Sequence, residues 1–237
     1  MGMVITSKRV PLLTAPTTVI QAGTLTVGSV VKLMEGGTAV DYLVVNQGIP
    51  SNSDLYDASC NGTWLLRKDV HSNRAWGNSN VTTYENSTIN TWLNGEFFNT
   101  LGSVEQITIK QVKIPYNSGS TEQSGANGLL CKVFLLGGYE VGIGGANDAV
   151  PQDGAKLDYF NQNTGADSKR IAYLNGSADS WWLRSRKPNS TTNVWLITSV
   201  GQYTNNNVIA EQGIRPALII PSTAKFDETT LQLKGVA

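Results

Sequence analysis

The sequence predicts an α+β fold with short strands, one or two helices and long polar loops. Apolar residues alternate with polar ones in short runs, which is the spacing of half-buried strands. Helical spacing of apolar residues occurs only near the middle of the chain, and no repeat of fixed period is visible. The 24 glycines and 21 asparagines suit a chain with many turns, because both residues tolerate turn conformations.

Three segments are expected along the chain. Residues 1–24 contain Pro11 and Pro16, which would break a helix, so we expect an extended N-terminal arm. This arm is either a flexible tail or a strand that docks on a neighbouring subunit. Residues 25–222 are expected to form the domain, and residues 223–237 a C-terminal tail.

The domain is expected to begin with a β-hairpin. Apolar runs at residues 25–27 and 30–33 precede Gly36 and Gly37, and a further run follows at residues 42–45. Two strand-like runs on either side of a glycine pair are a hairpin signal. After a turn-rich stretch, another strand is expected at residues 63–68.

The clearest helix begins after Asn86 and Ser87, which are both candidate N-cap residues. Four apolar residues follow at helical spacing on one face: Ile89, Trp92, Leu93 and Phe97. The Asn-Gly pair at residues 94 and 95 weakens or ends this helix. A second helix is expected at about residues 104–111, and residues 113–116 leave it in an extended form because a proline follows residue 114.

Strands and polar loops alternate over the rest of the chain. A loop is expected at residues 117–128, a buried strand at residues 130–136 and a glycine-rich loop at residues 137–154. This glycine-rich loop lacks the Gly-Lys-Ser/Thr sequence of a phosphate-binding loop. In the last third we expect strands at residues 180–185, 194–197 and 213–220, separated by polar runs at residues 186–193 and 205–207.

The charge balance disfavours several classes of partner. Lysine plus arginine equals aspartate plus glutamate at 18 each, and charged residues make up only 15% of the chain. A neutral, charge-poor chain is a poor electrostatic match for nucleic acid or for a membrane of anionic lipid. No apolar run approaches the length of a membrane span. Weak self-repulsion suits a protein packed beside copies of itself, so a homo-oligomer is expected.

Few residues suit metal or cofactor chemistry. The two cysteines, Cys60 and Cys131, lack metal or redox spacing and are either two buried thiols or one disulfide. The single histidine, His71, is expected in a loop and cannot build a metal site or a Ser-His-Asp triad alone. No clustered acidic motif for calcium is present. We therefore expect no metal and no cofactor.

Two motifs in the last third carry a resemblance to a known family. W-W-L-R-S at residues 181–185 is followed by G-I-R-P-A-L at residues 213–218. This pair resembles the pattern W-W-L-R-S-P and G-V-R-P-A-L of bacterial and phage proteins grouped as a domain of unknown function. Earlier blocks are similar too: L-V-V-N-Q-G at 43–48, W-L-L-R-K-D at 64–69, S-T-I-N-T-W-L at 87–93, V-K-I-P-Y at 112–116 and V-F-L-L at 133–136. The resemblance covers residues 25–222, and Arg186 departs from it where the family has proline.

The resemblance implies a C-type-lectin-like domain. The family is distantly similar to the formylglycine-generating-enzyme branch of that fold, which includes the variable proteins of diversity-generating retroelements. By this likeness Gly213, Ile214 and Arg215 would lie on the closing strand, and residues 186–212 would form a ligand-facing display region. The asparagines of this region are compatible with adenine-directed diversification, since asparagine codons are rich in adenine. Relatives without a retroelement also have asparagine-rich turns here, so both origins stay open.

Candidate site residues fall into two groups. Four residues lie in or beside polar runs, where loops bind ligands adaptably, and are expected to face a ligand: Trp195, Tyr203, Asn205 and Asn207. Five motif residues are expected to be structural: Trp181, Trp182, Arg184, Gly213 and Arg215. Alternation along a strand turns one tryptophan of the pair inward, and the other is either core or a platform for sugar stacking. The two arginines are expected to bridge strands through carbonyl or carboxylate partners.

The residue pattern does not favour an enzyme. Formylglycine-generating chemistry needs a reactive cysteine pair late in the domain, and residues 181–220 contain no cysteine. A glycosidase needs paired carboxylates in a cleft. Four aspartates are available, but nothing marks two of them as partners: Asp153, Asp158, Asp167 and Asp179.

We therefore expect a non-catalytic phage virion or tail protein, or a bacterial surface protein. It would bind a bacterial surface glycan or protein through its C-terminal polar loops, and it would contact other virion proteins and copies of itself. The alternative is a structural virion component, such as a decoration, collar or tail assembly protein, with no ligand of its own.

Overall fold

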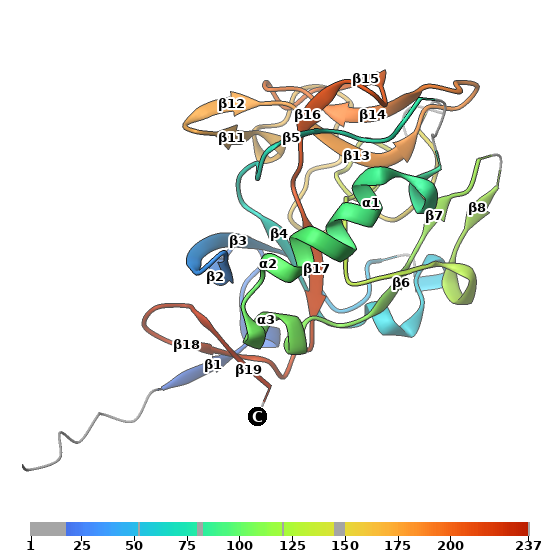
Figure 1. The fold of residues 1–237 in the computed structure, drawn as a ribbon. Helices are drawn as coiled ribbons and strands as arrows, with labels where there is room; N and C mark the ends of the chain where they lie inside the picture. Colours follow the sequence, from blue (N-terminus) through green and yellow to red (C-terminus); the bar gives the residue numbers. More distant parts are fainter. Residues whose placement is uncertain (1–17, 52, 80–82, 120, 145–149, 237) are drawn as a thin grey trace, which may run out of the picture.

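The fold is built on two five-stranded sheets, one above the other in the view of Figure 1. The computed structural model describes residues 18–51, 53–79, 83–119, 121–144 and 150–236. Within these residues the strands are short and the helices few and brief. The predicted α+β class is confirmed.

The first sheet is antiparallel throughout and has the order β10-β17-β4-β3-β2. Its strands are β2 (Val30–Glu35), β3 (Thr38–Gln47), β4 (Thr63–Arg67), β10 (Val133–Phe134) and β17 (Ala217–Ile220). The predicted hairpin is confirmed, because β2 and β3 meet at Gly36 and Gly37, whose φ angles are 54° and 82°. Glycine supplies the positive φ that this turn needs at both positions. Residues 25–27, expected in a strand, instead form a bend and the start of a turn.

The second sheet has the order β15-β14-β13-β16-β5, with only β13 and β16 parallel. Its strands are β5 (Asn73–Ala75), β13 (Trp181–Arg186), β14 (Asn193–Ile197), β15 (Tyr203–Asn207) and β16 (Glu211–Gly213). The prediction of a polar loop at residues 205–207 was wrong. These asparagines pair in register with Asn193, Val194 and Trp195 of β14. Pairing with a buried neighbour outweighs the poor strand preference of asparagine.

Two chain segments pass from one sheet to the other. The expected strand at residues 213–220 divides into the end of β16 in the second sheet and β17 in the first. The segment from β4 to β5 crosses beside it in the opposite direction. Backbone hydrogen bonds join the two segments, from Arg67 N to Pro216 O at 2.8 Å and from His71 N to Ile214 O at 2.8 Å. These crossings hold the two sheets as one unit.

Smaller sheets complete the fold. A three-stranded sheet contains β1 (Val19–Gln21), β18 (Lys225–Asp227) and β19 (Leu233–Gly235). Three two-stranded sheets pair β6 (Val112–Ile114) with β9 (Leu129–Cys131), β7 (Tyr116–Asn117) with β8 (Glu122–Gln123), and β11 (Ala172–Leu174) with β12 (Ser177–Asp179). The expected buried strand at residues 130–136 is thus divided between β9 and β10.

The ends of the described chain pack on the domain. β1 pairs with β18 of the same chain, and Ala22 and Phe226 are fully buried in the core. Residues 18–24 of the expected arm and most of the expected tail are therefore packed on the domain, while arm residues 1–17 lie outside the described part. Described residues on both sides of the expected boundaries at residues 25 and 222 therefore pack on the same domain.

The helical segments are α1 (Thr88–Trp92), the π-helix η5 (Leu93–Phe97), α2 (Phe98–Thr100) and α3 (Ser103–Thr108). The predicted helix start is confirmed, because Ser87 Oγ accepts a hydrogen bond from Asn90 N at 3.1 Å. The Asn-Gly pair at residues 94 and 95, where the helix was expected to weaken or end, lies in the π-helix η5. There Asn94 donates to Val133 O at 2.9 Å and accepts from Lys132 N at 2.9 Å, which fastens the helix to the start of β10. Short 3-10 turns are η1 (Ala22–Thr24), η2 (Ser53–Leu55), η3 (Ala58–Cys60), η4 (Tyr84–Asn86), η6 (Gly125–Asn127) and η7 (Ser168–Arg170).

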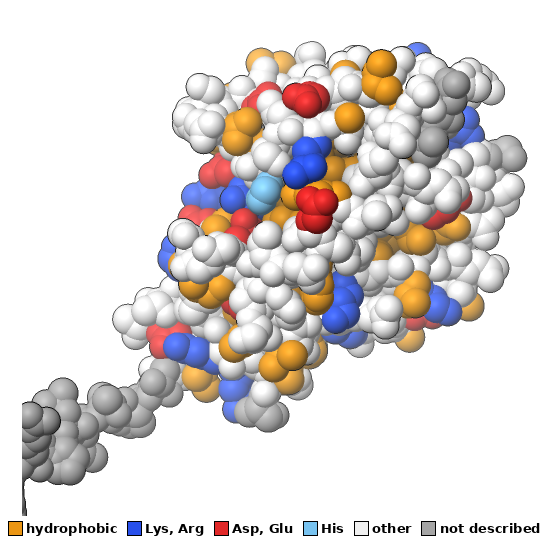
Figure 2. Space-filling view, viewed as in Figure 1, with side chains coloured by type: hydrophobic (Ala, Val, Ile, Leu, Met, Phe, Trp, Pro, Cys, Tyr) orange, Lys and Arg blue, Asp and Glu red, His pale blue; other side chains and the backbone are white. Residues whose placement is uncertain are grey.

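One hydrophobic core connects the strands and helices. Its largest fully buried apolar side chains are Trp64, Trp76, Trp181, Trp182, Tyr42, Tyr84, Phe97, Phe134 and Phe160. The face in Figure 2 is mostly uncharged, with acidic and basic side chains scattered over it singly or in small groups. This agrees with a sequence that is poor in charge and neutral overall.

Candidate functional site

Both tryptophans of the W-W-L-R-S strand are fully buried. Trp181 Nε1 donates to Arg170 O at 2.8 Å, and Trp182 Nε1 donates to Arg74 O at 3.0 Å. Successive side chains on β13 point to opposite faces of the sheet, so both faces are covered at this point. Neither ring is available for sugar stacking.

Arg184 ties β13 to two other parts of the chain. Its guanidinium forms a forked pair with Glu140, with Nη1–Oε2 at 2.6 Å and Nη2–Oε1 at 2.7 Å. It also donates to Pro115 O at 2.9 Å, to Leu135 O at 3.0 Å and to Asp153 O. Both Arg184 and Glu140 are buried, so this pair is an internal structural link.

The G-I-R motif closes the fold. Gly213 pairs with Trp181 in the parallel part of the second sheet, and a Cβ at residue 213 would collide with Ser180 O. Arg215 Nε donates to Arg67 O at 2.9 Å, and its guanidinium carbon lies 5.0 Å from the centre of the Trp181 ring. These contacts make the motif part of the structural frame.

The structure places the four residues expected to face a ligand on the β14–β15 hairpin. Trp195 is only 5% exposed, and its ring lies 5.5 Å from that of the half-buried Tyr203. Asn205 Oδ1 accepts from Asn193 Nδ2 at 2.8 Å, and Asn207 Oδ1 accepts from Ile209 N at 3.1 Å. Trp195 therefore belongs to the core, and both amides serve the local structure of the β14–β15 hairpin.

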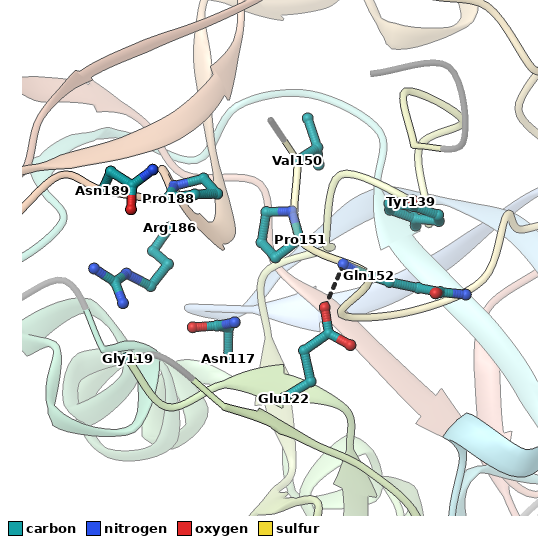
Figure 3. A pocket seen from close by; sticks show the side chains of 10 residues that line it. All are labelled: Asn117, Gly119, Glu122, Tyr139, Val150, Pro151, Gln152, Arg186, Pro188 and Asn189. Atoms are coloured by element: carbon teal, nitrogen blue, oxygen red, sulfur yellow. Dashed lines mark hydrogen bonds between the residues drawn. The ribbon is translucent and has the colours of Figure 1, made fainter. Parts of the chain in front are cut away.

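A cavity of about 610 Å³ opens where three loops meet (Figure 3). The first loop is the β7–β8 hairpin, the second follows β10 and the third follows β13. The described lining residues are Asn117, Gly119, Glu122, Tyr139, Val150, Pro151, Gln152, Arg186, Pro188 and Asn189. The third loop is the beginning of the expected display region.

Polar groups converge on this cavity, and two of them lack partners. Glu122 Oε1 accepts a hydrogen bond from Gln152 N at 2.7 Å, the dashed line in Figure 3. Arg186 Nη2 donates to Ser190 O at 3.0 Å, but its Nε has no hydrogen-bond partner among the described residues. Asn117 Oδ1 likewise has none within that part of the chain. Buried polar atoms are normally satisfied, so an unmet donor and an unmet acceptor on residues that line a cavity make it the candidate site.

Local backbone contacts hold the third loop in place. Asn189 adopts a φ of 59°, a left-handed conformation that asparagine tolerates. Ser190 Oγ accepts from Asn193 N at 3.0 Å, and Lys187 N donates to Asn193 O at 3.0 Å. Arg186, at the end of β13, is thereby fixed at the edge of the cavity.

Part of this cavity lies in the display region that the resemblance implies. Arg186 and Asn189 lie in the expected display region, and Arg186 was marked as a departure from the family pattern. Asn117, Glu122 and Gln152 were missed, because they lie in two segments interpreted only as loops. Their polar composition was the available signal, but only the fold brings them next to residue 186.

The other sequence candidates have structural roles. Cys60 and Cys131 are buried free thiols, and burial raises the pKa of Cys60 to about 12. His71 is half-buried and packs edge-on against Trp92 and Phe97, at 5.3 and 5.2 Å between ring centres. No group of three or more histidine, cysteine or acidic side chains suited to a metal occurs in the described ranges.

The four aspartates do not form a catalytic pair in the contacts that the structure gives them. Asp153 accepts from Ser185, and Asp167 caps the turn η7 through Lys169 N. The backbone N of Asp158 donates to Asn46 Oδ1 at 3.2 Å, and Asp179 Oδ2 accepts from Asn73 Nδ2 at 3.2 Å. The carboxylates of Asp153, Asp167 and Asp179 thus have structural partners.

Asp153 is a buried carboxyl beside the Arg184–Glu140 pair. Its Oδ2 accepts from Ser185 Oγ at 2.7 Å, whereas its Oδ1 has no partner among the described residues. Burial raises the pKa of Asp153 to about 6, although Arg184 and Ser185 oppose this shift. The folded protein therefore holds this proton at pH values where the unfolded chain has lost it.

We expect Asp153→Asn to reduce the pH dependence of stability between pH 5 and 7. Because the pKa of Asp153 is higher in the folded state, its contribution favours folding at low pH and is lost as the pH rises through 6. Lowering the pH from 7 to 5 should stabilise wild type by about 1 kcal/mol more than the variant. Urea unfolding at both pH values measures this difference, and equal pH slopes would show that Asp153 titrates normally.

Comparison with known proteins identifies one family. The family model described as "Domain of unknown function (DUF6273)" matches residues 61–222, which is more than half of the chain. No curated protein and no solved structure matches the chain significantly. Among the described residues, no helix is long and apolar enough to cross a membrane.

Proposed function

Because the chain belongs to the DUF6273 family of domains of unknown function, we propose a function from its own cavity: non-catalytic recognition of a bacterial surface glycan. One observation carries this proposal. Asn117 and Arg186 come from separate loops, line the same cavity, and each has a polar atom without a partner among the described residues. Both atoms are buried at the cavity wall, and a turn of each side chain toward the cavity would bring them to sugar hydroxyl groups, which both donate and accept.

The remaining lining residues also suit a sugar. Glu122, Gln152 and Asn189 add a carboxylate and two amides to the cavity wall. Tyr139 and the two prolines supply apolar surface for the apolar face of a sugar ring. The volume of about 610 Å³ lies within the range of roughly 300–1,000 Å³ that is typical of small-ligand sites.

The chemistry of the cavity favours binding over hydrolysis. Glycoside hydrolysis normally uses two carboxyl groups on either side of the bond that breaks. Glu122 is the one carboxylate among the described lining residues, and its Oε1 is engaged by Gln152 N at 2.7 Å. The proposal is therefore a binding domain and not an enzyme.

The proposed setting is a phage virion or tail, with a bacterial cell surface as the other location. A C-type-lectin-like relationship, contacts with other virion proteins and homo-oligomer formation belong to the same proposal. Arg186 at the end of β13 and Pro188 and Asn189 in the following loop line the cavity, which supports a display region that begins at Arg186. A neutral surface supports packing beside copies.

Binding of fluorescently labelled protein to whole Gram-positive cells tests the proposal. We expect saturable binding by wild type and at least a roughly tenfold weaker apparent Kd after Asn117→Ala combined with Arg186→Gln, because each removes hydrogen bonds to the ligand. The matched control is Asn205→Ala combined with Asn207→Ala, which changes two polar residues on β15 outside the cavity lining. This control should bind as wild type does.

Two results would contradict the proposed site. Loss of binding only in the Asn205 and Asn207 control would place recognition on β15. No saturable binding by any protein, together with assembly into defined rings or caps, would favour the structural virion component.

A further inference from the structure

A second and smaller cavity lies next to Arg215, away from the site described above. Its volume is about 270 Å³, and its lining includes Lys68, Asp69, Tyr159, Ile171, Tyr173 and Arg215. It shares no described lining residue with the larger cavity. Any ligand here would go beyond the proposed glycan recognition.

Arg215 is a buried cation without a carboxylate partner. The residue is 1% exposed, and it takes part in none of the ion pairs among the described residues. Its Nε donates to Arg67 O at 2.9 Å, but its Nη1 has no hydrogen-bond partner within the described chain. Arg184, equally buried, has a forked pair with Glu140. Unlike Arg184, Arg215 therefore has no carboxylate against its guanidinium among the described residues.

The surroundings of Arg215 do not replace the missing anion. The Trp181 ring, 5.0 Å from the guanidinium carbon, supplies a cation–π contact but no charge. Burial lowers the pKa of Arg215 to about 10, with only partial compensation from Tyr159 and Asp69. An anion in the adjoining cavity would favour the charged guanidinium.

The cavity has an excess of one positive charge. Lys68 and Arg215 line it as cations and Asp69 lines it as an anion. Asp69 Oδ1 accepts from Tyr173 N at 3.2 Å, and Lys68 Nζ also lies 3.5 Å from Asp41 outside the lining. Because Asp41 pairs with Lys68, Arg215 is the lining cation that has no ion pair among the described residues, and it suits a ligand with a single negative charge.

We propose that this cavity binds a small organic carboxylate, with Arg215 and Lys68 as the cationic groups that recognise it. A guanidinium matches the geometry of a carboxylate by two parallel hydrogen bonds. The Tyr159 and Tyr173 side chains would contact the organic part, and Ile171 adds an apolar wall. At about 270 Å³ the cavity accommodates a molecule no larger than a sugar acid.

Titration with glucuronate and with glucose, at an ionic strength held constant with sodium chloride, tests this inference. We expect glucuronate to bind and raise Tm, and glucose to do neither, because only glucuronate carries the carboxylate. Lys68→Gln should weaken glucuronate binding roughly fivefold through the lost charge. Lys234→Gln is the matched control, since both lysines are 45% exposed and lie 3.5 Å from an aspartate. It should leave the affinity unchanged.

A blocking variant locates the bound carboxylate. Ile171→Trp narrows the cavity without removing either cation and should abolish glucuronate binding, whereas Asn117→Ala in the larger cavity should not affect it. Equal binding of glucose and glucuronate, or undiminished binding by Ile171→Trp, would overturn the inference. Those results would leave the glycan proposal standing, because cell binding is measured with variants of the other cavity.

Discussion

Replacing Arg184 with methionine is expected to lower the free energy of unfolding by about 3–5 kcal/mol, because Glu140 loses its cation and keeps only the hydrogen bonds from Tyr56 Oη and Gly137 N. Glu140 is fully buried, and its two carboxylate oxygens accept from Arg184 at 2.6 and 2.7 Å. The same substitution removes the donors to Pro115 O and Leu135 O. Two buried carbonyls then lose these hydrogen bonds as well, which adds to the cost.

Urea unfolding of the purified variant measures this loss. The matched control is Lys32→Met, which removes an ion pair with Asp41 whose side chains are 42% and 35% exposed. An exposed pair contributes about 0–1 kcal/mol, so this control should lie close to wild type. A loss of less than about 1 kcal/mol for Arg184→Met would show that the buried pair does not hold β13 in place.

Replacing Trp181 with alanine is expected to lower the free energy of unfolding by about 3–5 kcal/mol. This is the usual range for removing a large aromatic side chain from a protein core. Trp181 is fully buried at the centre of the second sheet and donates to Arg170 O at 2.8 Å. Its ring also lies under the buried guanidinium of Arg215. The substitution therefore leaves a cavity and removes the aromatic support of that cation.

Thermal and urea unfolding of Trp181→Ala give the size of this effect. Trp92→Ala is the comparison, since Trp92 is only partly buried on α1 and carries Arg74 over its ring at 4.2 Å. We expect a clearly smaller loss from Trp92→Ala, because less apolar surface returns to water. Equal losses in the two variants would contradict a central packing role for Trp181.

The elements set by local signals were predictable from the sequence. The glycine pair at residues 36 and 37 fixed a hairpin turn, and Ser87 fixed the start of α1, because each acts on its immediate neighbours. The strand at residues 181–185 followed from the apolar residues Trp181, Trp182 and Leu183 at its start. These features depend on residues that are close together in the sequence, so they can be predicted without knowing the rest of the fold.

Features that depend on distant partners were not predictable. Asn205–Asn207 form a strand only because β14 lies beside them, and Trp195 is buried by the same pairing. The run at residues 130–136, which is apolar except for Lys132, gave no sign that it would divide between two sheets. In each case tertiary pairing outweighed the local preference.

The cavity illustrates the same limit. The sequence located Arg186 and Asn189 through the display region but gave no reason to join them with Asn117 or Gln152. The β7–β8 hairpin and the loop after β10 bring those residues to the end of β13. A site formed between loops depends on the path of the whole chain. The spacing of a motif describes only residues that are close together in the sequence.

NMR chemical-shift mapping of the Asn117 side-chain amide and the Arg186 Nε–H tests the central claim most directly. The probe is the cell-wall glycan released from cells that bind the labelled protein. We predict saturable shifts of both resonances, because these are groups with unmet hydrogen-bonding atoms, and unchanged amides of Asn205 and Asn207. Shifts at Asn205 and Asn207 with none at Asn117 and Arg186 would contradict recognition in the cavity.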